Sequence, residues 1–248
     1  APEIGAVVCR VAPSFIRFGS FQIHTADGNH ETLSQLLKHT ITNHFPEHTI
    51  DEDDGIITWL KHVAATTAEM IAHWMRVGFV HGVMNTDNMS IHGLTIDYGP
   101  YGWLENYDPN WTPNTTDSST RRYRYGQQAQ IGAWNIARLA EAVAPLMDDV
   151  QSLYSVLEHY ENKYIEYQNA MWGQKLGIDD FAEADEALVI ELDGLLQKVE
   201  TDMTIFFRML STIETPEIGL LESSFYDKNT IPIEEWNAWL EKWWKRVN

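Results

Sequence analysis

The residues whose types suggest chemistry lie in the run from His81 to Asn88 and, nine residues further on, at Asp97 to Gly99. Hard cations such as Mg²⁺ and Mn²⁺ prefer oxygen ligands, and Asn88 and Asp97 supply an amide carbonyl and a carboxylate. Asp87, beside Asn88, offers a carboxylate that can accept a proton. Asn and Asp are also ordinary turn residues at strand ends, so the residue types alone do not identify a metal site. The spacing between these residues is needed to distinguish a metal site from ordinary turns.

Protein kinases show this spacing in the motif H-R-D-x-x-x-x-N, which is followed by D-F-G. In kinases the Asn and the second Asp hold magnesium, and the first Asp receives the proton of the substrate hydroxyl. Here His81 takes the His position, Asn88 the Asn and Asp97 the second Asp. Val83 stands at the position of the first Asp, and a valine cannot accept a proton. The sequence therefore predicts a kinase-type metal site with a displaced base, for which Asp87 is the candidate.

Three stretches together resemble the selenoprotein O family: HGVMNTDNMSIHGLTIDYGPYGWLENYDP from His81, GAVVCRVAPSFIRFGSFQ from Gly5, and Gln127 to Leu139. The resemblance is dense over residues 1 to 145 and weakens to a helical pattern beyond. It implies a kinase-like fold and a pseudokinase that transfers AMP, rather than phosphate, from ATP to protein hydroxyls. The cofactor implied is Mg²⁺ or Mn²⁺.

The resemblance also implies roles for individual residues. The family's Asp at the position of Asp87 is taken as the proton acceptor; the alternative for Asp87 is a further metal ligand or a hydrogen-bond acceptor that braces the loop. Arg10 and Arg17 fall where the family uses arginines on the phosphates of a nucleotide that is turned around relative to kinases. A guanidinium holds phosphate oxygens at two points and is always charged, although surface ion pairing is the ordinary role of any Arg. Asn88 and Asp97 would hold the metal, with Asp97 also at the nucleotide.

The predicted reaction is metal-dependent transfer of AMP, or alternatively UMP, from ATP or UTP to Ser, Thr or Tyr hydroxyls of protein substrates. Two alternatives stay open. One is a conventional phosphotransferase, which Val83 disfavours. The other is a non-catalytic pseudokinase scaffold that binds a protein partner.

We expect this chain to be a fragment of such a protein. It begins at Ala1 without an initiator Met, and the Gly-rich loop, strand Lys and helix Glu of a kinase-like N-lobe are expected upstream of it. Members of the family also continue beyond the C-terminal end. A fragment of this kind is expected to bind nucleotide poorly and to transfer nothing detectable.

The N-terminal residues suggest part of a small sheet. Residues 6–11 and 15–23 are rich in β-branched and aromatic residues and are separated by Pro13, which predicts two strands. Cys9 is expected to be a small buried residue on the first of them. Residues 25–29 are typical of a turn, which we place between the two lobes.

The next elements would position the site. Apolar residues at helical spacing predict helices over residues 31–45 and 55–77, the second long enough to be the central helix of a C-lobe. A hairpin from Met89 to Ile96 is expected to follow the His81–Asn88 loop. This hairpin would place Asn88 and Asp97 at adjacent strand ends, as two ligands of one metal require.

Residues 99–126 lack periodicity and predict a long ordered loop in the place of the kinase activation segment. Arg121, Arg122 and Arg124 form a basic cluster in it, which we expect to be a solvated charge run more often than a contact for nucleotide or substrate. His81 and His92 are not predicted to bind zinc, because no second His or Cys lies at metal-ligand spacing from them.

From residue 127 onward the pattern is helical, with stripes over 131–143, 150–176, 188–199 and 203–213 and a last helix after Pro232. The last helix carries Trp236, Trp239, Leu240 and Trp243 at the spacing of one helix face, which favours core packing.

The predicted class is therefore α+β, a protein-kinase-like fold with a mostly helical C-lobe and a partial N-lobe sheet. The predicted divisions are residues 1–24 as partial N-lobe strands, 25–145 as the C-lobe with the metal site, and 146–248 as its helical extension.

Composition sets the outer limits. The chain has 248 residues, of which 44% are hydrophobic and ten are Trp, enough for a packed core. The formal net charge is -19, which disfavours nucleic acid and anionic membranes as partners, because both require a basic surface. The sequence has no run of about 18 apolar residues, so no membrane span is predicted. The expected compartment is the cytoplasm for a bacterial protein and the mitochondrion for a eukaryotic one.

Overall fold

The structure is a computed structural model, and it describes residues 5–48 and 53–248. The described chain is mostly helical and includes one sheet of two short strands, β1 (Phe79–Val80) and β2 (Gly102–Trp103). The strands pair antiparallel, with Phe79 opposite Trp103 and Val80 opposite Gly102. The predicted α+β class with a helical majority is thereby confirmed. Among the described residues, each helix is too short or too polar to cross a membrane.

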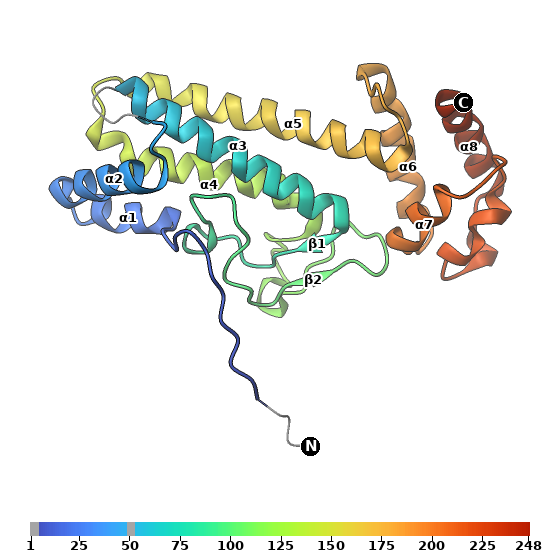
Figure 1. The fold of residues 1–248 in the computed structure, drawn as a ribbon. Coiled ribbons are helices and arrows are strands. Elements are labelled where there is room, and N and C mark those ends of the chain that lie inside the picture. The colour runs from blue at the N-terminus through green and yellow to red at the C-terminus, as the bar shows by residue number, and fades with distance from the viewer. Residues whose placement is uncertain (1–4, 49–52) are drawn as a thin grey trace.

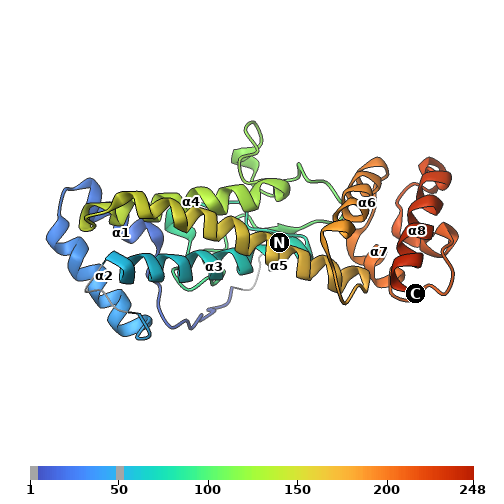
Figure 2. The same ribbon diagram turned by 90° about the horizontal axis from the view of Figure 1, so that it is seen from above.

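Three long helices run alongside one another and form the body of the molecule (Figures 1 and 2): α3 (Asp53–Val77), α4 (Gln128–Val143) and α5 (Tyr154–Leu176). α1 (Phe18–Ala26) and α2 (His30–His44) lie at one end of this bundle. The helices predicted over 31–45 and 55–77 are therefore confirmed within a few residues.

One hydrophobic core joins α1 to this bundle. Phe18 and Phe21 of α1 are fully buried, and the Phe21 ring lies 5.7 Å from the ring of Trp59 on α3. Gly132 of α4 allows α5 to approach closely, since a Cβ there would meet the Tyr160 hydroxyl at 2.2 Å. Burial of several large side chains of this kind contributes roughly 1.5–3 kcal/mol for each.

A second core is built by α6 (Glu186–Lys198), α7 (Met203–Leu210) and α8 (Ile233–Val247). The four residues of the predicted stripe on α8 are all buried there, so their assignment to core packing is confirmed: Trp236, Trp239, Leu240 and Trp243. The indole N–H groups of two of them also find acceptors, as buried indoles usually do. Trp239 donates to the Leu188 carbonyl at 2.9 Å, and Trp243 donates to the Leu176 carbonyl at 2.8 Å.

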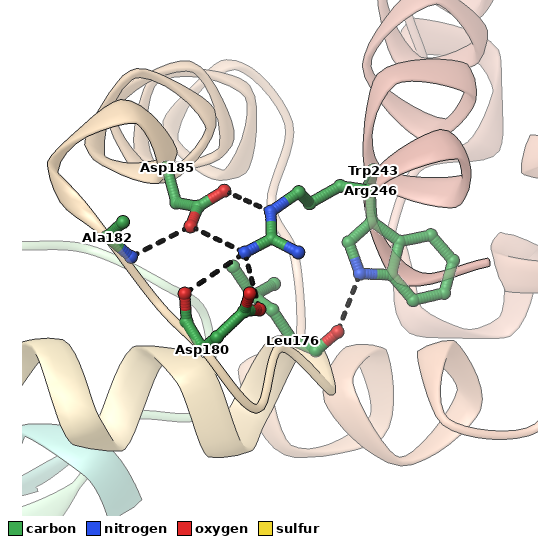
Figure 3. A network of polar contacts seen from close by, with 6 residues as sticks. All are labelled: Leu176, Asp180, Ala182, Asp185, Trp243 and Arg246. Atoms are coloured by element: carbon green, nitrogen blue, oxygen red, sulfur yellow. Dashed lines mark hydrogen bonds and ion pairs between the residues drawn. The ribbon is translucent and has the colours of Figure 1, made fainter.

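An arginine ties the end of α8 to the segment between α5 and α6 (Figure 3). Arg246 Nε donates to Asp185 Oδ1 at 2.6 Å, and Arg246 Nη2 donates to Asp180 Oδ1 at 2.8 Å. The same segment is braced internally, because Asp185 Oδ2 accepts from the Ala182 backbone N–H at 2.9 Å. The hydrogen bonds from Arg246 lower the pKa of both carboxyl groups.

Short 3-10 helices connect the longer elements. They are Thr86–Asn88 (η1), Thr115–Asp117 (η2), Tyr125–Gln127 (η3), Ala144–Leu146 (η4), Val150–Leu153 (η5), Glu183–Asp185 (η6), Ile218–Ser224 (η7) and Lys228–Thr230 (η8).

The two predicted N-terminal strands are wrong. Residues 5–12 have no regular structure, and Val7, Val8 and Cys9 are exposed, because no described segment lies beside them to complete a sheet. Residues 18–26 form the helix α1 instead. Phe18 and Phe21 are three apart, a helical spacing, and the Ser20 hydroxyl accepts from the Arg17 backbone N–H at 3.3 Å at the start of the helix. Packing of that face on Trp59 thus outweighs the β propensity of the aromatic residues.

The turn before α2 is confirmed but shorter than predicted. α1 ends at Ala26, and Asn29 caps α2 through its side-chain oxygen, which accepts from the Thr32 backbone N–H at 3.1 Å. The hairpin from Met89 to Ile96 is reduced to one antiparallel bridge between Met89 and Thr95. Its turn depends on Gly93, which has φ +61° and lies against the Thr66 carbonyl of α3, so that a Cβ would meet that oxygen at 2.5 Å.

Candidate active site

Buried side-chain amides hold the loop from His81 to Asn88 in place. Gln128 of α4 accepts from the His81 backbone N–H at 3.0 Å and donates to the Phe79 carbonyl at 2.9 Å. Asn135, also on α4, donates to the Met84 carbonyl at 2.9 Å, and Asn114 donates to the Gly82 carbonyl at 3.0 Å. These amides satisfy backbone groups that a buried loop would otherwise leave unpaired. Sequence reasoning did not identify them.

His81 fixes the residue that precedes Asp97. Its ring is buried and stacks on Trp74 with centroids 5.4 Å apart. Nδ1 faces the Val83 backbone N–H at 3.4 Å, so Nε2 carries the proton and donates to the Ile96 carbonyl at 2.8 Å. Burial lowers the pKa of His81, against weaker opposing effects from these hydrogen bonds and from Asp97. His81 is therefore a neutral packing and positioning residue.

The backbone places Asn88 and Asp97 at the same end of the residual hairpin. The antiparallel bridge from Met89 to Thr95 sets Asn88 opposite Ile96, one residue before Asp97. Asp97 adopts a left-handed backbone conformation with φ 54°, which is uncommon outside glycine and orients its side chain differently from that of a regular strand residue. The Met89–Thr95 bridge joins the segments that follow Asn88 and precede Asp97, and Asn88 itself ends the 3-10 helix η1. Convergence of the Asn88 and Asp97 side chains on one cation stays a prediction.

Arg17 lies beside this hairpin and faces Asp97. Its backbone pairs with Ser90 in an antiparallel bridge, and the Phe18 backbone N–H donates to the Met89 carbonyl at 3.1 Å. Arg17 Nη2 donates to Asp97 Oδ1 at 3.0 Å, while Arg17 Nε lies 2.8 Å from Asp97 Oδ2. Both side chains are about one third exposed, so solvent screens this pair.

Arg10 reaches the same region from the extended N-terminal segment. Its guanidinium carbon lies 3.5 Å from the centroid of the Tyr98 ring, an attractive cation–π contact. An open cavity of about 440 Å³ lies here. It is lined by Arg10, Phe15, Ile96, Asp97, Tyr98 and Gly99. The structure thus brings Arg10 and Asp97 to one opening, and Arg17 contacts Asp97, although both arginines were predicted on strands that do not form.

Asp87 is exposed in η1 and lies against the first turn of α1. A Cβ added to Gly19 would be 2.0 Å from Asp87 Oδ1 and 3.3 Å from the Asp87 backbone nitrogen. The absence of a side chain at Gly19 is therefore what leaves room for this carboxylate. The N-terminal turn of a helix also attracts negative charge, because its backbone N–H groups point toward it.

The basic cluster in the long loop makes mainly local contacts. The Arg122 guanidinium lies over the Trp134 ring at 4.6 Å, and Arg124 donates to the Arg121 carbonyl at 3.1 Å. The loop itself is tied to the site by Tyr123, whose hydroxyl donates to the Asn85 side chain. The long ordered loop predicted over 99–126 is therefore present, interrupted by β2 and two 3-10 helices.

The chain belongs to the family described as "Protein adenylyltransferase SelO", whose model matches residues 1–248. The resemblance to selenoprotein O is thereby confirmed, and it extends beyond the first 145 residues on which the sequence suggested it.

Several relatives carry the name "Protein nucleotidyltransferase YdiU". The chain is 48% identical to the one from Flavobacterium johnsoniae, a match that covers 100% of this chain and 49% of the relative. It is 49% identical to the one from Aromatoleum aromaticum (99% and 48% covered) and 53% identical to the one from Rhodopirellula baltica (86% and 40%). The chain thus spans about half the length of the curated relatives it matches.

Proposed function

We propose that the protein containing this chain is an enzyme that transfers AMP, or alternatively UMP, from a nucleoside triphosphate to Ser, Thr or Tyr hydroxyls of other proteins, in a metal-dependent reaction. The names of the family and of its relatives support nucleotidyl transfer to proteins. In this proposal the fold is kinase-like and the protein a pseudokinase. Residues 25–145 form its C-lobe, 1–24 belong to its N-lobe and 146–248 extend the C-lobe.

The observation that carries the proposal is the gathering of opposite charges at one opening. Arg10 and Asp97 line the same cavity, and Arg17 pairs with Asp97 beside it. In a chain of net charge -19, an anionic triphosphate needs such local positive charge to bind. Arg10 and Arg17 supply it, and guanidinium groups suit phosphate oxygens.

The donors present fit a hard divalent cation. Asn88 and Asp97 would hold Mg²⁺ or Mn²⁺ through an amide carbonyl and a carboxylate oxygen, the ligand types these ions prefer. When bound, the cation would neutralise charge on the triphosphate. Besides its proposed contact with phosphate, Arg17 would orient the Asp97 carboxylate, with which it pairs.

The proposed step forms one bond and breaks one. The substrate hydroxyl oxygen attacks the α-phosphorus, and the bond from that phosphorus to the α,β-bridging oxygen breaks, so that pyrophosphate leaves. Asp87 accepts the hydroxyl proton. Asp87 is exposed, which suits access of a protein substrate, and the proton acceptor in phosphoryl-type transfers depends more on position than on basicity.

The proposed partners are ATP, or UTP, and proteins that present hydroxyl side chains, with neither nucleic acid nor membrane as a partner. The acidic chain supports this, because both excluded partners select basic surfaces. The relatives named above come from bacteria. We therefore place the protein in the bacterial cytoplasm rather than the mitochondrion.

The test is to incubate the full-length protein with protein substrate, Mg²⁺ and ATP that carries radiolabel on either the α- or the γ-phosphate. Label from α-labelled ATP is expected on protein, and Asp87→Ala and Asp97→Ala should lose it. Asp27→Ala is the control, since Asp27 is an exposed acid at the end of α1, outside the site. Label from γ-labelled ATP alone would establish a conventional kinase. Absence of label together with unimpaired biological function of Asp97→Ala would establish a scaffold.

A further inference from the structure

A second group of potential metal ligands lies where the end of α2 meets α3, among the described residues 5–48 and 53–248. Glu47 and His48 follow α2, and His62 projects from α3. His48 Nε2 lies 3.2 Å from His62 Nδ1. Glu47 Oε1 lies 3.7 Å from each of these nitrogens. The sequence did not indicate this group, because His48 and His62 are 14 residues apart and lie on separate elements.

These separations match those of ligands around one tetrahedral ion. Zinc binds His nitrogen and carboxylate oxygen at about 2.1 Å, so two tetrahedral ligands lie about 3.4 Å apart. The three observed separations lie within 0.3 Å of that value. The two imidazole planes are nearly perpendicular, at 89°, with ring centroids 5.2 Å apart, so the rings meet edge to face.

The surroundings also suit a metal. Phe45 packs against His62 with ring centroids 5.3 Å apart and forms an apolar wall. The His48 side chain is 10% exposed, whereas those of Glu47 and His62 are 53% and 37% exposed. The two more exposed ligands leave one side open to water.

We propose that Glu47, His48 and His62 form a binding site for Zn²⁺, with water as the fourth ligand, separate from the proposed Mg²⁺ or Mn²⁺ site at Asn88 and Asp97. Two imidazoles and one carboxylate are the ligand set of open zinc sites. The bound ion would connect the turn after α2 to α3. The site does not depend on the proposed transferase activity, and it involves none of the residues assigned to it.

Without a metal, the same three residues would form only a His–His hydrogen bond with a weak ionic contact to Glu47. A zinc site and a metal-free hydrogen-bonded group differ in whether the protein binds Zn²⁺. Zn²⁺ should bind to metal-free full-length protein in the presence of excess Mg²⁺, which nitrogen ligands do not favour. It should also raise the melting temperature, because an ion that binds the folded state stabilises it.

The experiment is calorimetric titration of Zn²⁺ into the metal-free wild type and into variants. His62→Ala and Glu47→Gln are expected to weaken one equivalent of binding by about 10²-fold or more, since even outer-shell changes cost zinc sites 10- to 100-fold. His73→Ala is the matched control, because His73 is an exposed histidine on the same helix and should leave binding unchanged. Co²⁺ bound to wild type should show the visible absorption of tetrahedral coordination, which His62→Ala removes.

Two results would overturn the proposal. One is equal Zn²⁺ stoichiometry and affinity in wild type, His62→Ala and Glu47→Gln. The other is a loss in His73→Ala as large as that in His62→Ala, which would mean dispersed surface binding. Glu47→Gln alters a half-exposed side chain, so it tests the site even if His62→Ala fails to fold.

Discussion

Arg17 and Asp97, eighty residues apart in the chain, face each other at two points, with Nη2 to Oδ1 at 3.0 Å and Nε to Oδ2 at 2.8 Å. The sequence suggested separate roles, a phosphate clamp for Arg17 and a metal ligand for Asp97. The pairing shows that the two residues act on each other. Arg17 orients the Asp97 carboxylate, and any ligand that takes one of them changes the charge around the other.

Substitution of Arg17 should therefore impair more than nucleotide affinity. We expect Arg17→Ala to lower kcat/KM of nucleotidyl transfer by about 10²-fold, a typical cost of losing one charge-stabilising donor. Arg17→Lys keeps the charge but not the planar two-point contact, so it should recover only part of this loss. Steady-state kinetics with α-labelled ATP measure both. Equal activity of wild type and Arg17→Ala would contradict the clamp role.

Gly19→Ala offers a test of Asp87 that leaves the carboxylate itself intact. The added Cβ would lie 2.0 Å from Asp87 Oδ1, so the carboxylate must move. We expect kcat to fall by roughly 10²-fold, at the lower end of the range for loss of a general base, with little change in melting temperature. Gly194→Ala is the matched control, because a Cβ on that α6 glycine meets no atom within 4 Å. Unchanged kcat in Gly19→Ala would count against Asp87 as the base.

His81 should make stability depend on pH. Burial lowers its pKa in the folded state, so the unfolded chain binds the proton more readily. The contribution of His81 to the free energy of unfolding is then fully present above the ordinary His pKa of about 6.5 and is lost as the pH falls below it. His81→Gln keeps a donor toward the Ile96 carbonyl but cannot titrate. The fall in melting temperature between about pH 7.5 and 5.5 should be smaller in this variant than in wild type. An identical pH profile would show that His81 does not contribute.

Gln128 should matter for stability well beyond its size. Gln128→Ala leaves the Phe79 carbonyl and the His81 backbone N–H without their partner in a buried place. The expected loss in free energy of unfolding is about 3 kcal/mol, measured by denaturant titration. Gln130→Ala, an exposed position on the same helix, should change it by less than about 0.5 kcal/mol. Similar midpoints for the two variants would show that water replaces the Gln128 amide.

The helices were predictable from the sequence because their pattern is local. Apolar residues at helical spacing gave α2, α3 and the Trp face of α8 within a few residues. The strand predicted over 15–23 was wrong because the contact that determines its structure is not local. Its aromatic residues favour strands, but the decisive contact, Phe21 against Trp59, joins positions far apart in sequence.

The site was predictable only in part. Residue spacing and family resemblance selected Arg10, Arg17 and Asp97. Arg10 and Asp97 line one opening, and Arg17 pairs with Asp97. The amides of Gln128 and Asn135 could not be recognised in advance. Their hydrogen bonds to backbone groups depend on how α4 packs, and neither residue type nor spacing indicates this.

α5 contributes to both hydrophobic cores, which affects how the protein unfolds. Its first half contributes Val156 and Tyr160 to one hydrophobic interior, and its last residue, Leu176, belongs to the other. A continuous helix of this kind, with about 1.5 Å of rise for each residue, connects the two cores rigidly. Unfolding of either hydrophobic core would expose the part of α5 that packs in it. Thermal unfolding should therefore show a single cooperative transition across the described chain rather than two independent ones.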